Sequence, residues 1–158
     1  MFDPAALASY GLPGLFVLAF LAGSVVPLPS DALLAAMIFR GEPFVISVAV
    51  ATVGNTLGAA TLFWLGAQVA NGRGGPLGRW LKRRTEKDPV GTERARARVA
   101  RWGAPALLMS WMPIVGDAVV IAAGIAGVGR WSFLLYTTTG KTIRFTAVAL
   151  TALAAASS

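Results

Sequence analysis

The sequence of 158 residues contains neither cysteine nor histidine. Without cysteine there is no disulfide and no thiol chemistry, and without histidine there is no histidine metal site, Ser-His triad or histidine proton relay. We therefore expect no catalytic residue, no metal, no cofactor and no enzymatic activity. An intramembrane hydrolase with Ser30 beside Asp31 is the weakest of the alternatives that the sequence leaves open.

Charged residues are also scarce, at 13% of the chain, where soluble domains carry about 25%. Asp31 is the only charge in residues 4–39, Asp117 is the only one in 102–129, and 43–72 has none. Runs of about 20 apolar residues predict membrane spans. The first apolar stretch follows no basic residue, so we expect no signal peptide. The composition predicts one membrane domain over residues 1–158, crossing the membrane several times.

The net charge of +7 is concentrated in residues 73–101, and the rest of the chain sums to zero. A basic block can indicate nucleic-acid binding. This block joins apolar segments, so the positive-inside rule favours a cytoplasmic loop over a nucleic-acid partner. Its piece 77–84 mixes Trp80 and Leu81 with cations, which predicts contact with anionic lipid headgroups.

Four apolar segments are expected, at about 12–40, 43–70, 102–128 and 131–156. Pro27 and Pro29 interrupt the first, and Pro113 interrupts the third, with Gly116 close behind. Proline removes a backbone donor and clashes with the preceding turn, so neither segment can be a straight helix. Each half is too short to span the bilayer. The pattern favours re-entrant hairpins, which survive only where protein or a wet cavity covers them.

A shift of 86 residues aligns the two halves of the chain without a gap. Pro27 falls on Pro113, and Asp31 falls on Asp117. Further identical pairs are Leu21 and Leu107, Ser24 and Ser110, Gly41 and Gly127, Thr52 and Thr138, Gly54 and Gly140, and Thr56 and Thr142. Proline and aspartate are uncommon at membrane depth, so these matches indicate an internal repeat.

The repeat predicts the architecture. Repeat one covers about 12–70, a cytoplasmic basic linker covers 71–101, and repeat two covers about 102–156. A hairpin returns to its own side, so each repeat crosses the membrane once and the second is inverted. The predicted fold is an all-α membrane protein with an inverted repeat of two re-entrant hairpins, each followed by a transmembrane helix, and with both termini outside the cytoplasm.

Asp31 and Asp117 each start the second half of a broken segment. One interpretation is a helix N-cap, which aspartate favours. A charge in mid-membrane costs roughly 2.5–3.5 kcal/mol even on insertion scales, and serine or asparagine would cap as well. The alternative is a pair that couples transport to a proton or another cation.

Lys141 and Arg144 lie one helical turn apart and so share a face. They form either an ion pair with Asp31 or Asp117, or a site for an anionic phosphate headgroup, and the two can alternate. Asn55, the repeat partner of Lys141, is a candidate hydrogen-bonding residue. The glycines of the GNTLG motif at 54–58 favour close helix packing.

Four motifs carry a resemblance to a known family: PLPSD at 27–31, GNTLG at 54–58, SWMPIVGD at 110–117 and GKTIR at 140–144. They resemble the DedA superfamily, also called the VTT or SNARE-associated Golgi protein family, and above all its short YqaA branch. The resemblance covers about residues 15–150. It implies a bacterial inner-membrane protein with two facing re-entrant hairpins, in which Asp31 and Asp117 take the places of the hairpin acids.

The same resemblance implies a function. Family members are linked to proton-dependent membrane homeostasis and to moving lipids such as undecaprenyl phosphate and phosphatidylethanolamine, and eukaryotic relatives are scramblases. Trp111 and Met112 stand where many longer members carry an arginine, and Asp31 stands where glutamate is more usual. We therefore expect a transporter of a phosphate-bearing lipid. The alternatives are a non-transporting homeostasis or assembly factor and a transporter of small ions or cationic drugs. The lipid, direction, coupling ion and oligomeric state stay open.

Overall fold

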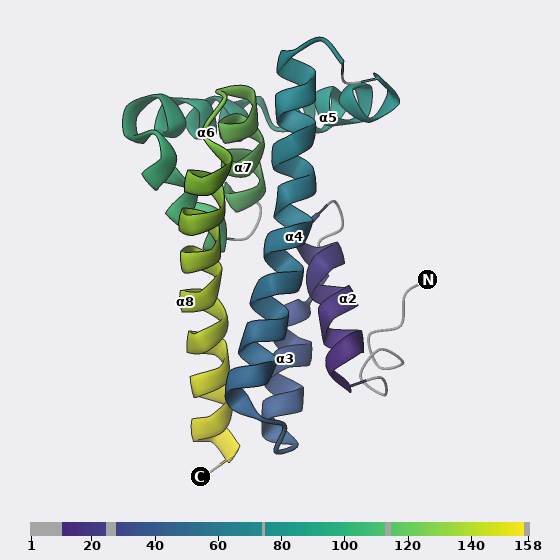
Figure 1. The fold of residues 1–158 in the computed structure, drawn as a ribbon, viewed down its shortest axis with the longest axis vertical. Helices are drawn as coiled ribbons and strands as arrows, with labels where there is room; N and C mark the ends of the chain where they lie inside the picture. Colours follow the sequence, from purple (N-terminus) through teal and green to yellow (C-terminus); the bar gives the residue numbers. More distant parts are fainter. Residues whose placement is uncertain (1–10, 25–27, 74, 113–114, 157–158) are drawn as a thin grey trace. The chain divides into compact units, whose positions relative to one another are not determined.

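The computed structural model describes residues 11–24, 28–73, 75–112 and 115–156, and these residues form helices and no strand. The helices are α2 (Gly11–Gly23), α3 (Ser30–Phe39), α4 (Phe44–Ala70), α5 (Gly75–Lys87), α6 (Pro89–Trp102), the 3-10 helix η1 (Ala104–Trp111), α7 (Val115–Ile125) and α8 (Arg130–Ala156). Figure 1 shows them along the chain. The chain divides into two compact units, one of residues 1–58 with 141–158 and the other of residues 59–140.

The predicted apolar segments agree with these helices. Segment 43–70 is α4 and segment 131–156 is α8, each an unbroken helix of 27 residues. Segment 12–40 divides into α2 and α3, and segment 102–128 divides into η1 and α7. Pro29 lies directly before α3, while Pro27 and Pro113 lie outside the described residues. The sequence thus locates both breaks, while the re-entrant path and the inversion of the repeat stay predictions.

Two local features differ from the expectation. The half before the second break is a 3-10 helix, a form that suits short connectors, and Pro105 in its first turn supplies no backbone donor. The linker is not a loop but two helices, α5 and α6. Asp88 begins α6 because its Oδ1 accepts a 2.9 Å hydrogen bond from the Gly91 backbone N–H, and Pro89 follows at the first helical position.

The first unit packs α2, α3, the start of α4 and the end of α8 around one core. Its largest fully buried side chains come from three of these helices: Leu15 and Leu18 of α2, Leu34 of α3 and Phe145 of α8. Such a core holds α3 and α8 at fixed places within the unit.

Glycine residues allow the backbones of α2 and α4 to come into direct contact. A Cβ on Gly54 would lie 2.7 Å from the carbonyl oxygen of Phe16, and a Cβ on Gly58 would overlap that of Phe20. A Cβ on Gly23 would overlap the carbonyl of Asn55 in the same way. The expectation of close packing for the GNTLG motif is therefore confirmed, and this contact places Asn55 against α2.

The second unit has its own core, built from the end of α4, α6, η1, α7 and the start of α8. The rings of Phe63 and Phe133 stack there with centroids 4.3 Å apart. Ala95 and Val99, one turn apart on α6, are buried in the same cluster. The linker therefore contributes to a core as well as carrying charge.

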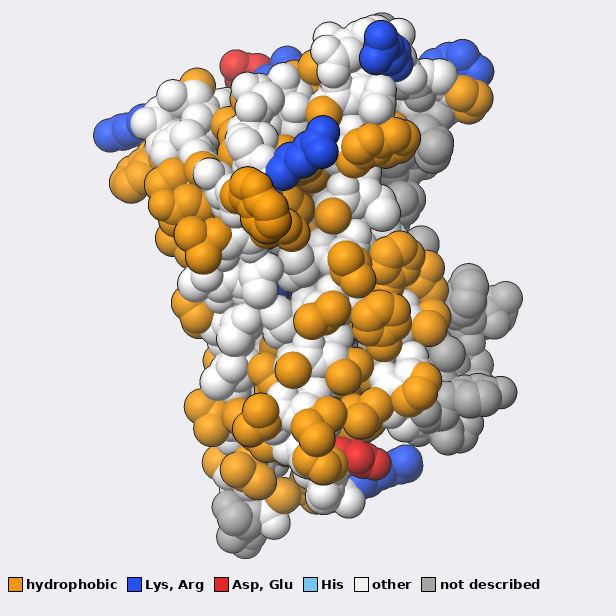
Figure 2. Space-filling view, in the orientation of Figure 1, with side chains coloured by type: hydrophobic (Ala, Val, Ile, Leu, Met, Phe, Trp, Pro, Cys, Tyr) orange, Lys and Arg blue, Asp and Glu red, His pale blue; other side chains and the backbone are white. Residues whose placement is uncertain are grey.

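Helix α4 is the one helix among the described residues that is long and apolar enough to cross a membrane. Its exposed large side chains are apolar, among them Val45, Ile46, Val53, Leu57 and Trp64. Figure 2 shows hydrophobic side chains over much of the described surface of the face drawn, with few charged ones between them. A surface of this kind suits lipid hydrocarbon better than water.

Candidate functional site

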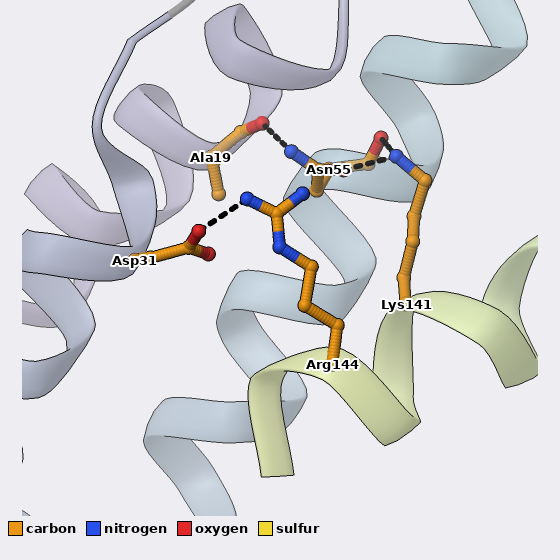
Figure 3. Close-up of polar contacts among 5 residues, drawn as sticks. All are labelled: Ala19, Asp31, Asn55, Lys141 and Arg144. Carbon is orange, nitrogen blue, oxygen red and sulfur yellow. Dashed lines mark hydrogen bonds and ion pairs between the residues drawn. The ribbon is translucent and has the colours of Figure 1, made fainter. Parts of the chain in front are cut away.

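An ion pair joins α3 to α8 within the first unit. The Nη2 of Arg144 donates to Oδ2 of Asp31 (Figure 3). The two side chains are 23% and 34% exposed, so a group from outside the unit can reach the pair. Phe145, the next residue of α8, is fully buried in the core of the unit. Its packing fixes the position of the neighbouring Arg144 relative to α3.

Asp31 is not the N-cap of its helix. Pro29 occupies that position, and no side chain makes a capping hydrogen bond there. Asp31 sits in the first turn, where a negative charge is favoured by the helix dipole. Its Oδ1 is buried and has no hydrogen-bond partner among the described residues. The N-cap interpretation is therefore wrong for Asp31, and its carboxylate is oriented by Arg144.

A second polar contact lies beside the first. The Nζ of Lys141 donates to Oδ1 of Asn55 and, at 3.2 Å, to the Asn55 backbone carbonyl. The Nδ2 of Asn55 donates at 2.9 Å to the carbonyl oxygen of Ala19 on α2. Lys141 and Asn55 are only 4% and 5% exposed. A buried ammonium group requires such acceptors, because burial without them is costly.

The first unit thus brings together four of the five predicted binding residues: Asp31, Asn55, Lys141 and Arg144 (Figure 3). The fifth, Asp117, belongs to the other unit, where it lies half-buried in the first turn of α7. The predicted ion pair of the α8 cations with Asp31 is present, and Arg144 makes it.

The predicted break residues have different roles. Gly116 is buried in α7, and a Cβ there would lie 2.5 Å from the carbonyl oxygen of Ser110, so only glycine lets η1 and α7 approach this closely. Pro29 sets the start of α3. Pro27 and Pro113 lie outside the described residues.

Two features of the first unit were not predicted. The Ala19 carbonyl that orients Asn55 is a backbone group, and its only signal in the sequence is the glycine spacing that brings α2 close to α4. The second is an apolar groove of 410 Å³ elsewhere in the first unit, which includes none of the five predicted binding residues in its lining: Phe44, Val45, Val48, Ala49, Thr52 and Val53 of α4, and Thr142 and Thr146 of α8. Its residues are ordinary for a membrane helix, so no motif indicated it.

In the first unit, both cations of the site are held by oxygen atoms of neighbouring side chains, Arg144 by Asp31 and Lys141 by Asn55. Arg144 offers a planar fork of donors that matches phosphate as well as carboxylate, and Lys141 adds a second cation one turn away on the same helix. The described residues include no cluster of three or more His, Cys, Asp or Glu side chains that could hold a metal ion.

Comparisons with known proteins find one matching family domain and several relatives of similar length. The VTT domain matches residues 26–152. Inner membrane protein YqaA of Escherichia coli (strain K12) is 36% identical over 137 residues, covering 85% of this chain and 86% of that protein, and its Shigella flexneri counterpart gives the same values. An uncharacterized protein of Haemophilus influenzae is 30% identical over 142 residues, which cover 85% and 82% of the two chains. No solved structure matches the chain.

Proposed function

The chain belongs to the VTT domain family, and on this premise we propose that it carries a phosphate-bearing lipid across the membrane. The protein is located in the bacterial inner membrane, the location that the names of its Escherichia coli and Shigella relatives state. The proposed substrate is undecaprenyl phosphate or a phospholipid, and the proposed coupling ion is the proton. The protein itself is proposed to act without enzymatic chemistry.

The proposal rests on the polar cluster in the first unit, in which Lys141 and Arg144 of α8 contact Asn55 and Asp31. Lys141 and Arg144 are charged residues in a membrane protein, where charge at hydrocarbon depth is expensive and is found at sites of function. Both are held by oxygen atoms, those of Asn55 and Asp31, which occupy the places that phosphate oxygens can take. A cation paired with an exchangeable carboxylate suits transient binding of an anion better than permanent structure.

The contacts within each unit also support the proposed inverted repeat. Asn55 and Lys141, which are 86 residues apart and occupy equivalent repeat positions, touch each other. Residues related by a twofold axis meet where they lie near that axis, and transporters built on inverted repeats bind substrate there. Gly54 and its repeat partner Gly140 each pack against the backbone of a half-helix before a break, at Phe16 and Leu108 respectively.

A headgroup translocation assay tests the function. The full chain is reconstituted into phosphatidylethanolamine–phosphatidylglycerol liposomes that contain a trace of phosphatidylethanolamine with a fluorescent headgroup, and external dithionite then bleaches the outer leaflet. Vesicles with the protein are expected to lose fluorescence beyond the level of protein-free vesicles. Bleaching that stops at the same level in both would refute translocation of the phospholipid.

The same reconstituted protein separates the two alternatives. A transporter of small cations predicts uptake of a cationic dye that does not depend on Arg144, because its site would be the aspartates. An assembly factor predicts no flux of either kind, with Asp31→Asn changing thermal stability alone.

We also propose that α5 and α6 bind anionic lipid headgroups at the cytoplasmic surface. Both helices are amphipathic and basic, and Arg79 and Arg83 of α5 are exposed. We expect trypsin to cleave at these arginines several-fold more slowly in phosphatidylglycerol vesicles than in phosphatidylcholine vesicles, with the difference lost at 1 M salt, where screening is nearly complete. Equal cleavage rates in both lipids at low salt would contradict headgroup binding.

A further inference from the structure

Three arginines form a stripe along one side of α6 in the second unit. Arg94, Arg98 and Arg101 occupy positions i, i+4 and i+7, which share one face of a helix. We propose that this arginine stripe is a binding site for a lipid that carries two phosphodiesters, of the cardiolipin class. The inference rests on the headgroup binding proposed for α5 and α6, and it specifies the side chains and the lipid.

The arginine stripe lacks acidic partners. No acidic residue stands three or four positions from any of its members, and no described residue of another helix forms a salt bridge with it. Arg96 differs, because it lies on the other side of α6, one turn after Glu93. The helix dipole favours a cation in the last turn, but this explains Arg101 alone. Like charges at this spacing repel each other, so an external anion bound to the stripe stabilises α6.

Helix α6 is held in place before any ligand binds. Ala95 and Val99 are 1% and 5% exposed and belong to the core of the second unit, where α6 packs against η1 and α7. Figure 1 shows α6 beside α7. The backbone that carries the stripe is therefore already ordered, which reduces the entropy that binding costs.

The length and chemistry of the stripe favour two linked phosphates. It spans seven residues, or about 10 Å of helix at 1.5 Å per residue. Arg94 and Arg101 are exposed and Arg98 is half-buried, so three guanidinium forks are available to phosphate oxygens. When one phosphate of a cardiolipin binds, the second is tethered nearby and its binding becomes intramolecular. Two separate phosphatidylglycerol molecules carry the same charge without this advantage.

An exposed tryptophan next to the stripe favours a lipid over a soluble phosphate ester. Trp102 ends α6 and is 61% exposed, and the Arg101 guanidinium carbon lies 5.8 Å from the centroid of its ring. Tryptophan is enriched at the level of the headgroups, where its ring contacts both hydrocarbon and polar groups. A ligand that fits both side chains has phosphate for Arg101 and hydrocarbon for Trp102.

Calorimetric titration of the full chain in dodecyl maltoside tests the preference. The titrants are mixed micelles that contain tetraoleoyl cardiolipin or twice that amount of dioleoyl phosphatidylglycerol, so that phosphate and charge are equal. We expect cardiolipin to bind at least about tenfold more tightly than phosphatidylglycerol. Equal affinity for the two lipids would overturn the inference, and this comparison needs no variant.

Single arginine variants locate the site. Arg94→Gln and Arg98→Gln each remove one fork, and each is expected to lower the affinity for cardiolipin about tenfold. Arg96→Gln is the matched control, because it removes the same charge from the other side of α6, and its affinity should stay near that of the wild type. Because Arg94 is exposed, Arg94→Gln tests the site even where Arg98→Gln does not fold. Equal losses in Arg94→Gln and Arg96→Gln would assign binding to general surface charge and overturn the inference.

Three further results separate the sources of failure. The deacylated headgroup of cardiolipin is expected to bind more weakly than the lipid, and equal binding would overturn the lipid assignment. Slower tryptic cleavage of α5 on phosphatidylglycerol without a preference for cardiolipin would support general headgroup binding and overturn this inference. A preference for cardiolipin in a protein that fails the dithionite assay would refute translocation and leave this inference standing.

Discussion

Replacement of Arg144 by glutamine is expected to slow headgroup translocation by about a hundredfold, equivalent to roughly 2.7 kcal/mol. The substitution removes the donor fork that is proposed to hold the lipid phosphate, and it leaves Asp31 without its partner. Hydrogen bonds to charged groups contribute about 1.5–3 kcal/mol each, so the loss of one or two such bonds gives an effect of this size. The measurement is the dithionite bleaching rate in liposomes with equal amounts of folded protein.

Two companion variants separate function from stability. Arg144→Lys keeps the charge but loses the planar fork, and it is expected to retain about a tenth of the rate. The double variant Asp31→Asn with Arg144→Gln removes the isolated carboxylate and is expected to be more stable than Arg144→Gln alone, because a partly buried charge that has lost its partner is destabilising. If the double variant translocated lipid at the wild-type rate, the pair would be structural only.

The sequence predicted the positions of the helices better than the contacts between them. The two helix breaks were located correctly from proline at positions 27, 29 and 113, and α4 was located correctly from the uncharged run 43–72. Proline content and lack of charge are local properties of the chain, so they can be read without knowing the tertiary packing. Asp31 was correctly assigned to the start of α3, but its proposed role as a cap was wrong, since capping depends on a single residue of register that the sequence does not define.

The partners of the charged residues were left as alternatives because they depend on tertiary packing. Spacing showed that Lys141 and Arg144 share a face, but it could not show that one turns to Asn55 and the other to Asp31. That choice depends on how far α2 and α3 approach α4 and α8. The helical linker was missed for a related reason: Ala95 and Val99 are inconspicuous among the arginines of α6 until the core that they join is known.

Alanine at Gly58 is expected to destabilise the protein by about 3 kcal/mol, although alanine alone favours a helix by about 1 kcal/mol over glycine. The added Cβ would overlap the carbonyl oxygen of Phe20 and lie 2.8 Å from the backbone carbon of Gly23. These are backbone atoms of a packed helix, which cannot rotate away as a flexible side chain can. The overlap is therefore larger than the gain in helix propensity, and α2 must move away from α4.

Movement of α2 would also disturb the site. The Ala19 carbonyl that accepts a hydrogen bond from Asn55 belongs to α2, and Asn55 in turn accepts a hydrogen bond from Lys141. The expected result is a midpoint of thermal unfolding in detergent lower by roughly 5–10 °C, together with slower translocation. Gly129→Ala is the control, because the atom nearest to the added Cβ would be the Ser132 hydroxyl oxygen at 3.8 Å. The unfolding midpoint of this variant should stay near that of the wild type. A Gly58→Ala variant as stable as the wild type would show that α2 and α4 do not meet at Gly58, and the support for the Asn55–Lys141 contact would be lost with it.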